Sequence, residues 1–324
     1  MKVVRFTGAG GNDVVELHER PTPEPGGQEV RVRVRFAGLN PADVRQRQGL
    51  YPAPRGVVPD VPGLEVAGTV ETVGPAATRW RRGDRVFGLV AGGGLSSHVI
   101  VDESCLTTVP ANLSEAEASA VPEAFVTAHD ALMTQGGLRM GETVLIRAGS
   151  GAVGSAAIQI AREAGATVLT TVRNKEAKAF VESLGATVLD GASPVQDTPG
   201  GVGDRGVDLV LQLVGGETIT DDLDALALRG RIVVVGVPAG QDATVDLRAL
   251  MHKRASVVGT VLRSRPVSER ALALRSFERQ VLPSMAAGRF EIKVSQVFAS
   301  NRAAEAFDAV ERAGRIGKVL IEFD

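Results

Sequence analysis

The chain has 324 residues, 44% hydrophobic and 23% charged, which is typical of a folded globular protein with two domains. Its formal net charge of −2 gives no general attraction to nucleic acid or to an anionic membrane surface, so we expect neither as a partner. A single cysteine, Cys105, excludes an internal disulfide and a multi-cysteine zinc site.

The first residues, MKVVRFTGAGG, lack the apolar region of a signal peptide. No later segment approaches the ~20 apolar residues that a membrane span needs. Together with the single cysteine, which suits a reducing compartment, these features predict a cytoplasmic protein with no membrane partner.

Residues 1–120 have the pattern of strands separated by proline and glycine turns. Charged and apolar residues alternate from Arg31 to Phe36, which is typical of a strand with one face in a core and the other in water. Further strands are expected at residues 65–73, 85–90 and 97–101. This part of the chain is predicted to be a compact, mainly antiparallel β domain.

From Thr143 onward, short continuous apolar runs alternate with helical segments. The runs at residues 143–148, 167–172, 207–214, 231–237 and 255–261 suit strands buried on both faces of a parallel sheet, and the helices suit its crossovers. One helix is expected after Asn174, which can cap it, and Gly185 can end it. The pattern predicts a doubly wound α/β domain.

The last 60 residues or so return to helices and end in a strand, KVLIEF. We expect this tail to complete the first domain. The predicted domains are therefore residues 1–120 with 265–324, and residues 121–264.

A glycine turn follows the first strand of the α/β domain. Gly149, Gly151 and Gly154 have G-x-G-x-x-G spacing, which favours a dinucleotide whose pyrophosphate lies at the helix N-terminus. A P-loop would need lysine where Ser155 stands. A nucleophile elbow around Ser150 would need glycines two residues on either side, where the chain has alanines.

The second strand of the α/β domain ends without a carboxylate that could bind the adenosine ribose. Arg173, Lys175 and Lys178 follow instead, and cations there can accept a 2′-phosphate. NADPH is therefore favoured over NADH. The alternative is that these cations only solvate the start of a helix.

The two halves together resemble the medium-chain dehydrogenase/reductase superfamily over essentially the whole chain. The resemblance rests on motifs at residues 37–52, 61–75, 81–89, 121–132, 148–166 and 314–320. It implies a GroES-like β domain that carries an inserted Rossmann domain. Zinc-dependent members have cysteine and histidine ligands where this chain has Asn40 and Leu64, so it resembles the zinc-independent quinone oxidoreductases and is most similar to the tumour-suppressor-inducible branch.

The resemblance also assigns roles to individual residues. Asn40 and Tyr51 would face substrate and nicotinamide as catalytic residues, and no metal is expected. The cofactor would contact Thr127, the turn Gly149, Ser150, Gly151, Ala152, Val153 and Gly154, the 2′-phosphate residues Arg173, Asn174 and Lys178, and backbone at Val235, Val237, Val261 and Arg263. One departure is Gly191, where the family often has a tyrosine beside the adenine phosphate.

Without a metal, the chemistry is expected to come from positioning a hydride donor against a quinone or an α,β-unsaturated carbonyl. Tyr51, the only tyrosine, can supply the proton, or it can pack at the site while water does so. The preferred function is an NADPH-dependent quinone reductase. The alternatives are an enone or 2-enoyl thioester reductase, and an NADPH-binding sensor or structural protein with little turnover. As in its relatives, the strand segment at 255–262 is expected to pair with its twin in a homodimer.

Overall fold

The computed structural model describes residues 1–189, 205–312 and 314–324, and these residues form two compact units. Unit 1 contains Met1–Val126 and Leu262–Asp324, and unit 2 contains Thr127–Val261. The sequence analysis placed the changes of domain after residues 120 and 264. Gly191 lies outside the described residues.

Unit 1 is built on a seven-stranded sheet of order β14–β15–β3–β4–β5–β7, in which β6 also pairs with β3. All strand pairs are antiparallel except β14 with β15, which confirms the predicted mainly antiparallel β domain. The strands are β3 (Glu29–Leu39), β4 (Glu65–Val73), β5 (Arg85–Leu89), β6 (His98–Asp102), β7 (Leu106–Thr108), β14 (Val294–Ala299) and β15 (Lys318–Glu322).

The alternation in β3 has the expected effect. Val32 and Val34 are buried in the core of unit 1, while Arg33 and Arg35 are exposed on the opposite face. The C-terminal strand β15 pairs with β3, so the tail does complete the first domain. The sequence did not predict β14 or the hairpin of β1 (Lys2–Phe6) and β2 (Val15–Glu19), because β2 is largely exposed, β14 is half exposed, and both lack a clear apolar pattern.

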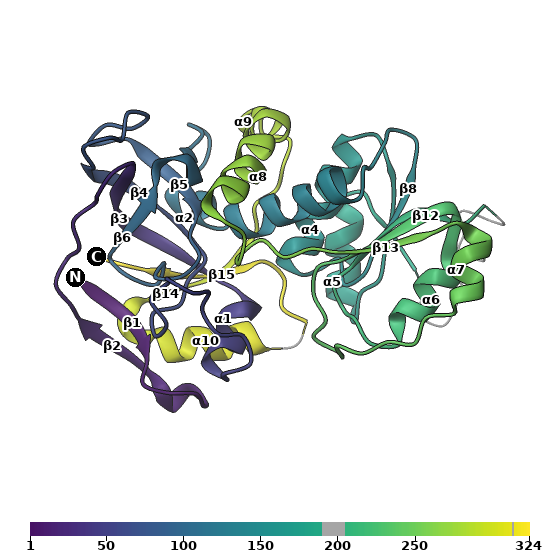
Figure 1. The fold of residues 1–324 in the computed structure, drawn as a ribbon, viewed down its shortest axis with the longest axis horizontal. Helices are drawn as coiled ribbons and strands as arrows, with labels where there is room; N and C mark the ends of the chain where they lie inside the picture. The colour runs from purple at the N-terminus through teal and green to yellow at the C-terminus, as the bar shows by residue number, and fades with distance from the viewer. Residues whose placement is uncertain (190–204, 313) are drawn as a thin grey trace. The chain divides into compact units, whose positions relative to one another are not determined.

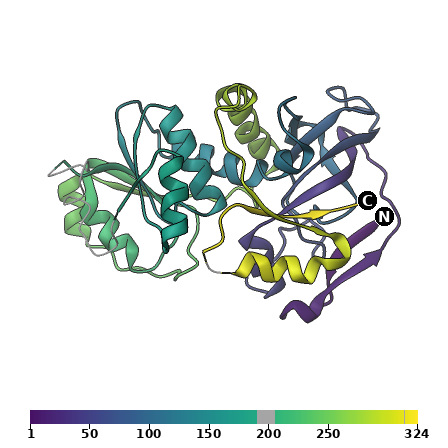
Figure 2. The same ribbon diagram turned by 180° about the vertical axis from the view of Figure 1, so that it is seen from behind.

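Short helices surround this sheet. The last one, α10, lies along β2 and α1 (Figures 1 and 2) and contributes Phe307 to the core. The helices are α1 (Pro41–Arg47), α2 (Glu115–Ser119), α8 (Val267–Gln280), α9 (Leu282–Ala286) and α10 (Ala303–Glu311), with single turns η1 (Asn12–Val14), η2 (Glu103–Cys105) and η7 (Ser300–Arg302) and the π-helical η3 (Pro122–Val126).

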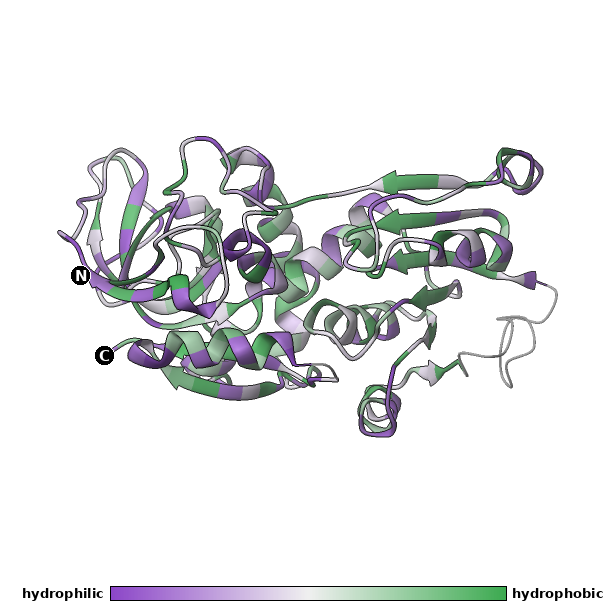
Figure 3. Ribbon diagram, turned by 90° about the horizontal axis from the view of Figure 1, so that it is seen from below, coloured by the Kyte–Doolittle hydropathy of each residue, from purple (hydrophilic) through white to green (hydrophobic). Residues whose placement is uncertain are grey.

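Unit 2 has a six-stranded, fully parallel sheet of order β10–β9–β8–β11–β12–β13. The chain begins at β8 in the middle, proceeds to one edge, and returns to build the other half, as a doubly wound sheet does. The strands, which are largely apolar (Figure 3), are β8 (Thr143–Ile146), β9 (Thr167–Thr170), β10 (Thr187–Val188), β11 (Val207–Gln212), β12 (Leu226–Val234) and β13 (Ser256–Gly259).

Helices connect these strands: α4 (Ala152–Glu163), α5 (Lys175–Ser183), α6 (Thr218–Ala225) and α7 (Leu247–Lys253), after an initial α3 (Thr127–His129) and π-helical η4 (Asp130–Gln135). The cap expected for α5 is present, since the Asn174 side chain accepts a hydrogen bond of 2.7 Å from Ala177 N. Gly185, at φ +93°, follows the end of this helix. No helix in the described ranges has both the length and the apolar character required to span a bilayer.

Candidate functional site

The glycine turn of unit 2 connects β8 to α4, where the G-x-G-x-x-G pattern placed it. A Cβ on Gly154 would lie 2.5 Å from the Ala148 carbonyl oxygen, so only glycine allows the helix to pack this closely on the strand. On Gly151 the nearest atom would be 3.5 Å away. Gly151 is exposed and is the N-cap of α4, with no side-chain cap for the first N–H groups of the helix.

These features fit a pyrophosphate. The first turn of a helix presents unpaired N–H donors and a positive dipole end, which favour an anion. Gly151 leaves the approach open, whereas Gly154 is needed for packing. Ser150, Ala152 and Val153 lie within the same turn or begin α4, so the predicted pyrophosphate residues lie together at one helix end.

A network of polar side chains lies next to this turn, at the ends of β8 and β11. Arg147, directly before the turn, forms an ion pair of 2.6 Å with Asp222, whose side chain is fully buried. Gln212 donates to Asp222 and accepts from the backbone N–H of Val214. The network joins the ends of β8 and β11 to α6, and Ala148 follows it in the left-handed region at φ +57°.

The predicted 2′-phosphate residues follow β9. Arg173 and Lys178 are exposed, and Lys178 pairs with Glu182 at 3.8 Å along α5. The side-chain oxygen of Asn174 is used to cap α5. No carboxylate stands between the end of β9 and Arg173, where one would bind the ribose hydroxyls of NADH.

Thr127 and the 235–237 segment are the other predicted contacts in unit 2. The Thr127 Oγ1 atom is buried and has no hydrogen-bond partner among the described residues, as expected for a polar atom that hydrogen-bonds a ligand. Val235 N donates to the Gln212 carbonyl, which fixes the backbone just before Val237. Val261 is exposed.

In unit 1, Asn40 lies in a buried polar cluster. Its amide donates 2.9 Å to Glu65, and its oxygen accepts from the ammonium of Lys318, which also pairs with Glu65. The Asn40 N–H donates 2.9 Å to Asp43, the residue at N3 of α1. Asn40 is 5% exposed, and its side chain hydrogen-bonds Glu65, Lys318 and, at 3.4 Å, the Gly38 carbonyl.

Burial raises the pKa of two carboxyl groups in the same cluster. The pKa of Asp43 rises to about 6, although hydrogen bonds from Gly63 and Asn40 oppose the shift. The pKa of Glu123 rises to about 8, because burial is reinforced by the neighbouring Glu65 carboxylate, to which the Glu123 N–H donates. At neutral pH, Glu123 is therefore mostly a neutral acid.

Tyr51 lies beside Arg263. The Arg263 guanidinium stacks on its ring at 5.1 Å, and burial raises the pKa of the phenol while Arg263 opposes the rise. The sequence analysis predicted only a backbone role for Arg263. It also missed Glu123 and Lys318, although both lie inside the family motifs at 121–132 and 314–320, because a motif match does not identify which side chains meet.

The zinc-ligand positions do not fit a metal. Leu64 is apolar and 1% exposed, and the Asn40 oxygen already faces the Lys318 ammonium, which would repel a cation. Within the described ranges, no group of three histidine, cysteine or acidic residues is arranged to hold a metal ion. We therefore assign no step to zinc.

The comparisons with known proteins cover both units. A family model described as "Alcohol dehydrogenase GroES-like domain" matches residues 26–111, and one described as "Zinc-binding dehydrogenase" matches residues 152–278. The chain is 34% identical to quinone oxidoreductase-like protein 2 of Bos taurus, over 94% of this chain and 88% of that protein.

Two solved structures have nearly the same fold. The quinone oxidoreductase of Pseudomonas syringae pv. tomato DC3000 has a TM-score of 0.88 and 30% identity, covering 99% of both chains. The CurK enoyl reductase has a TM-score of 0.85 and 26% identity, covering 100% of this chain and 99% of that one. The predicted fold, a GroES-like β domain with an inserted Rossmann domain, is confirmed.

Proposed function

We propose that this chain, which belongs to the medium-chain dehydrogenase/reductase superfamily and is a quinone oxidoreductase-like protein, transfers a hydride from NADPH to a quinone without zinc. One observation carries the proposal. The only tyrosine, Tyr51, lies against the buried Arg263 cation, in a unit whose zinc-ligand positions hold Asn40 and Leu64. The reaction then depends on positioned side chains rather than on a metal.

Oxidoreductases of this superfamily use a nicotinamide cofactor, and the proposal specifies NADPH. The glycine turn at the start of α4 would bind the pyrophosphate, and Thr127 Oγ1 would find its partner in the cofactor. Arg173, Asn174 and Lys178 would hold the 2′-phosphate, since two of them are exposed cations and no carboxylate stands between β9 and Arg173. Backbone at Val235, Val237, Val261 and Arg263 would hold the nicotinamide end.

When bound, NADPH supplies the hydride from C4 of its nicotinamide. The Tyr51 phenol, whose pKa is raised by burial, stays protonated at neutral pH and donates a proton to the reduced acceptor. The guanidinium on its ring stabilises the phenolate that remains until water returns a proton. Asn40 would face substrate through the edge of the buried cluster, where Lys318 and Glu65 fix its amide.

A second candidate is a reductase of enones or 2-enoyl thioesters, which needs the same cofactor and hydride step. It is favoured by the likeness to the CurK enoyl reductase over nearly the whole chain. A third candidate, of another class, is an NADPH-binding sensor or structural protein with little turnover.

Steady-state NADPH oxidation with quinones, enones and enoyl-CoAs separates these three functions. We expect the highest kcat/KM with quinones. Turnover of enoyl thioesters alone would replace the quinone proposal with the second candidate. Tight NADPH binding in a fluorescence titration, with no turnover of any acceptor, would support the third.

We also propose a cytoplasmic homodimer. The single buried cysteine suits a reducing compartment. The edge strand β13 carries exposed Val257, and exposed Leu247 and Met251 belong to the adjacent α7, so a second copy could extend the sheet and cover them. Solution scattering at micromolar concentration should give the mass of a dimer, and a monomer mass would contradict this assembly.

A further inference from the structure

A cavity of about 700 Å³ lies within unit 1, and we call it the basic cavity. One wall is the loop at residues 54–58, which begins three residues after Tyr51. A second wall is formed by residues 89–93 with β6, and a third by residues 263–267 with Arg270 of α8. Apolar side chains such as Val57, Val61 and Val99 provide much of its inner surface.

Cations outnumber carboxylates in the lining of the basic cavity. The carboxylates are Glu29 and Asp102, and Asp102 already accepts hydrogen bonds from the N–H and hydroxyl of Ser104. The cations are the N-terminal ammonium, Arg20, Arg55, Arg263, Arg265 and Arg270. Arg20 is paired with Asp60 outside the lining, and the cavity is electropositive because six cationic groups line it against two carboxylates.

Arg263 is 4% exposed and lines this cavity. Its guanidinium donates 2.8 Å to the Ala91 carbonyl, to Gln46, and 3.5 Å to the Tyr51 carbonyl. Within the described residues Arg263 forms no direct ion pair with a carboxylate; burial lowers its pKa, while the nearby Asp43 and Glu123 carboxyl groups oppose that shift. A buried guanidinium whose hydrogen-bond partners are all neutral is stabilised when an anion binds.

Arg270 also has a guanidinium N–H donor without a hydrogen-bond partner among the described residues. One of its terminal nitrogens donates to the carbonyls of Arg263 at 3.3 Å and Arg265 at 2.9 Å. Its Nε is buried and has no hydrogen-bond partner in the part of the chain that the structure describes. A guanidinium offers five N–H donors in one plane, so two arginines around one cavity can surround an anion.

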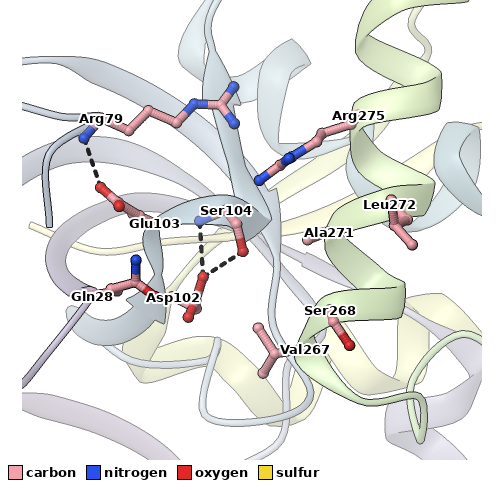
Figure 4. A pocket seen from close by; sticks show the side chains of 10 residues that line it. All are labelled: Gln28, Arg79, Asp102, Glu103, Ser104, Val267, Ser268, Ala271, Leu272 and Arg275. Carbon is pink, nitrogen blue, oxygen red and sulfur yellow. Dashed lines mark hydrogen bonds between the residues drawn. The ribbon is translucent and has the colours of Figure 1, made fainter.

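A neighbouring cavity of about 570 Å³ gives a comparison (Figure 4). It is lined by Val267 from the start of α8, as the basic cavity is, but its charges are matched. Glu103 accepts 2.7 Å hydrogen bonds from backbone N–H groups, and Arg79 pairs with Glu278 at 2.7 Å. Arg275, also on α8, is exposed at this second cavity.

We propose that the basic cavity binds an anionic group of the acceptor, a carboxylate, sulfonate or phosphate, between Arg263 and Arg270. The inference rests on the proposed function, because it takes Tyr51 as the reacting end of the site. The Tyr51 ring covers the same guanidinium that lines the cavity. An acceptor reduced beside Tyr51 can therefore extend its charged group past Arg263 toward Arg270.

The test compares 1,2-naphthoquinone with 1,2-naphthoquinone-4-sulfonate in the full-length protein. Arg270→Met should raise KM for the sulfonate about 10- to 100-fold, as expected for loss of a hydrogen bond between charged groups. It should change KM for the neutral quinone less than about twofold. If Arg270→Met does not fold, Arg55→Gln, on the exposed loop of the same cavity, is the variant to compare with the two quinones. Arg275→Met is the matched control on α8 and should leave both values unchanged.

Equal effects of Arg270→Met and Arg275→Met on the sulfonate would overturn the inference. A raised KM for NADPH with an unchanged preference for the sulfonate would also overturn it, since the anion would then belong to the cofactor. If neither quinone is reduced, the proposed function fails, and calorimetric titration of the sulfonate still decides the inference: binding weakened by Arg270→Met but not by Arg275→Met supports it, and absent binding overturns it.

Discussion

Units 1 and 2 use their buried polar groups in different ways. In unit 2 the candidate cofactor site is made mainly of backbone at the start of α4, and the buried Arg147–Asp222 pair only supports it. In unit 1 the candidate active site consists of polar and charged side chains brought together from distant segments, such as Lys318 and Asn40, 278 residues apart. Backbone sites are encoded by a local pattern, whereas side-chain sites depend on the whole fold.

The largest expected effect breaks the buried cluster of unit 1. Lys318→Met should lower the free energy of unfolding by about 3–5 kcal/mol, because Glu65 would keep a buried charge without its cation. Urea unfolding measures this change. Arg302→Met is the control, since its pair with Glu305 is more than half exposed and should contribute far less than the buried pair. Equal losses in the two variants would contradict the role given to the cluster.

The second prediction concerns the side-chain chemistry of unit 1. Tyr51→Phe should lower kcat for a quinone about 100-fold, because the ring still packs on Arg263 but has no proton to donate. Stopped-flow measurement of NADPH oxidation checks it, with the melting temperature as the test of folding. An unchanged kcat would mean that water supplies the proton and that Tyr51 only packs.

The backbone site of unit 2 gives the third prediction, which is that substitutions at two of its glycines have different effects. Gly154→Ala should destabilise the protein by about 1–3 kcal/mol, because its methyl group collides with the Ala148 carbonyl. Gly151→Ala should leave stability within about 0.5 kcal/mol but weaken NADPH binding about tenfold, because the methyl would take up space proposed for the pyrophosphate. Thermal unfolding and fluorescence titration measure the two effects, and matching behaviour of the variants would refute the separation.

The fourth prediction is a pH dependence from the buried acids of unit 1. Because the pKa of Glu123 is about 8 in the folded protein and near 4.5 when unfolded, the native state holds more protons between these values. The free energy of unfolding therefore falls as pH rises from about 4.5 to about 8. Asp43 contributes in the same direction up to about pH 6. Glu123→Gln should flatten the fall between pH 6 and 8, and an unaltered profile in urea unfolding would show that this acid ionises normally.

The smallest expected effect is at the surface of unit 2. Arg173→Ala should weaken NADPH binding about tenfold and leave NADH binding unchanged, because an exposed arginine gives a screened but direct contact to a 2′-phosphate. Fluorescence titration with both cofactors measures the ratio. Affinities for NADH and NADPH that are equal, and insensitive to the substitution, would remove the phosphate site.

The sequence predicted unit 2 well because its information is local. Five apolar runs matched the strands β8, β9, β11, β12 and β13, and the cap at Asn174 was correct. In unit 1 the antiparallel strands followed from alternation, but β14 did not, since it is half exposed. The partners of Asn40 and Tyr51 could not be predicted, because no local pattern specifies that Lys318 or Arg263 returns to them across more than 200 residues.

The placement of β15 sets the order in which the protein can fold. Residues 127–261 of unit 2 are complete before the last segment of the chain is synthesised, so this unit can fold on the ribosome as a whole. Unit 1 cannot: until residues 318–322 emerge, β3 has an open edge where β15 will pair, and Glu65 lacks its lysine. Loss of even a short C-terminal segment during synthesis would therefore leave a chain in which unit 2 is folded. The sheet of unit 1 would be incomplete and prone to aggregate.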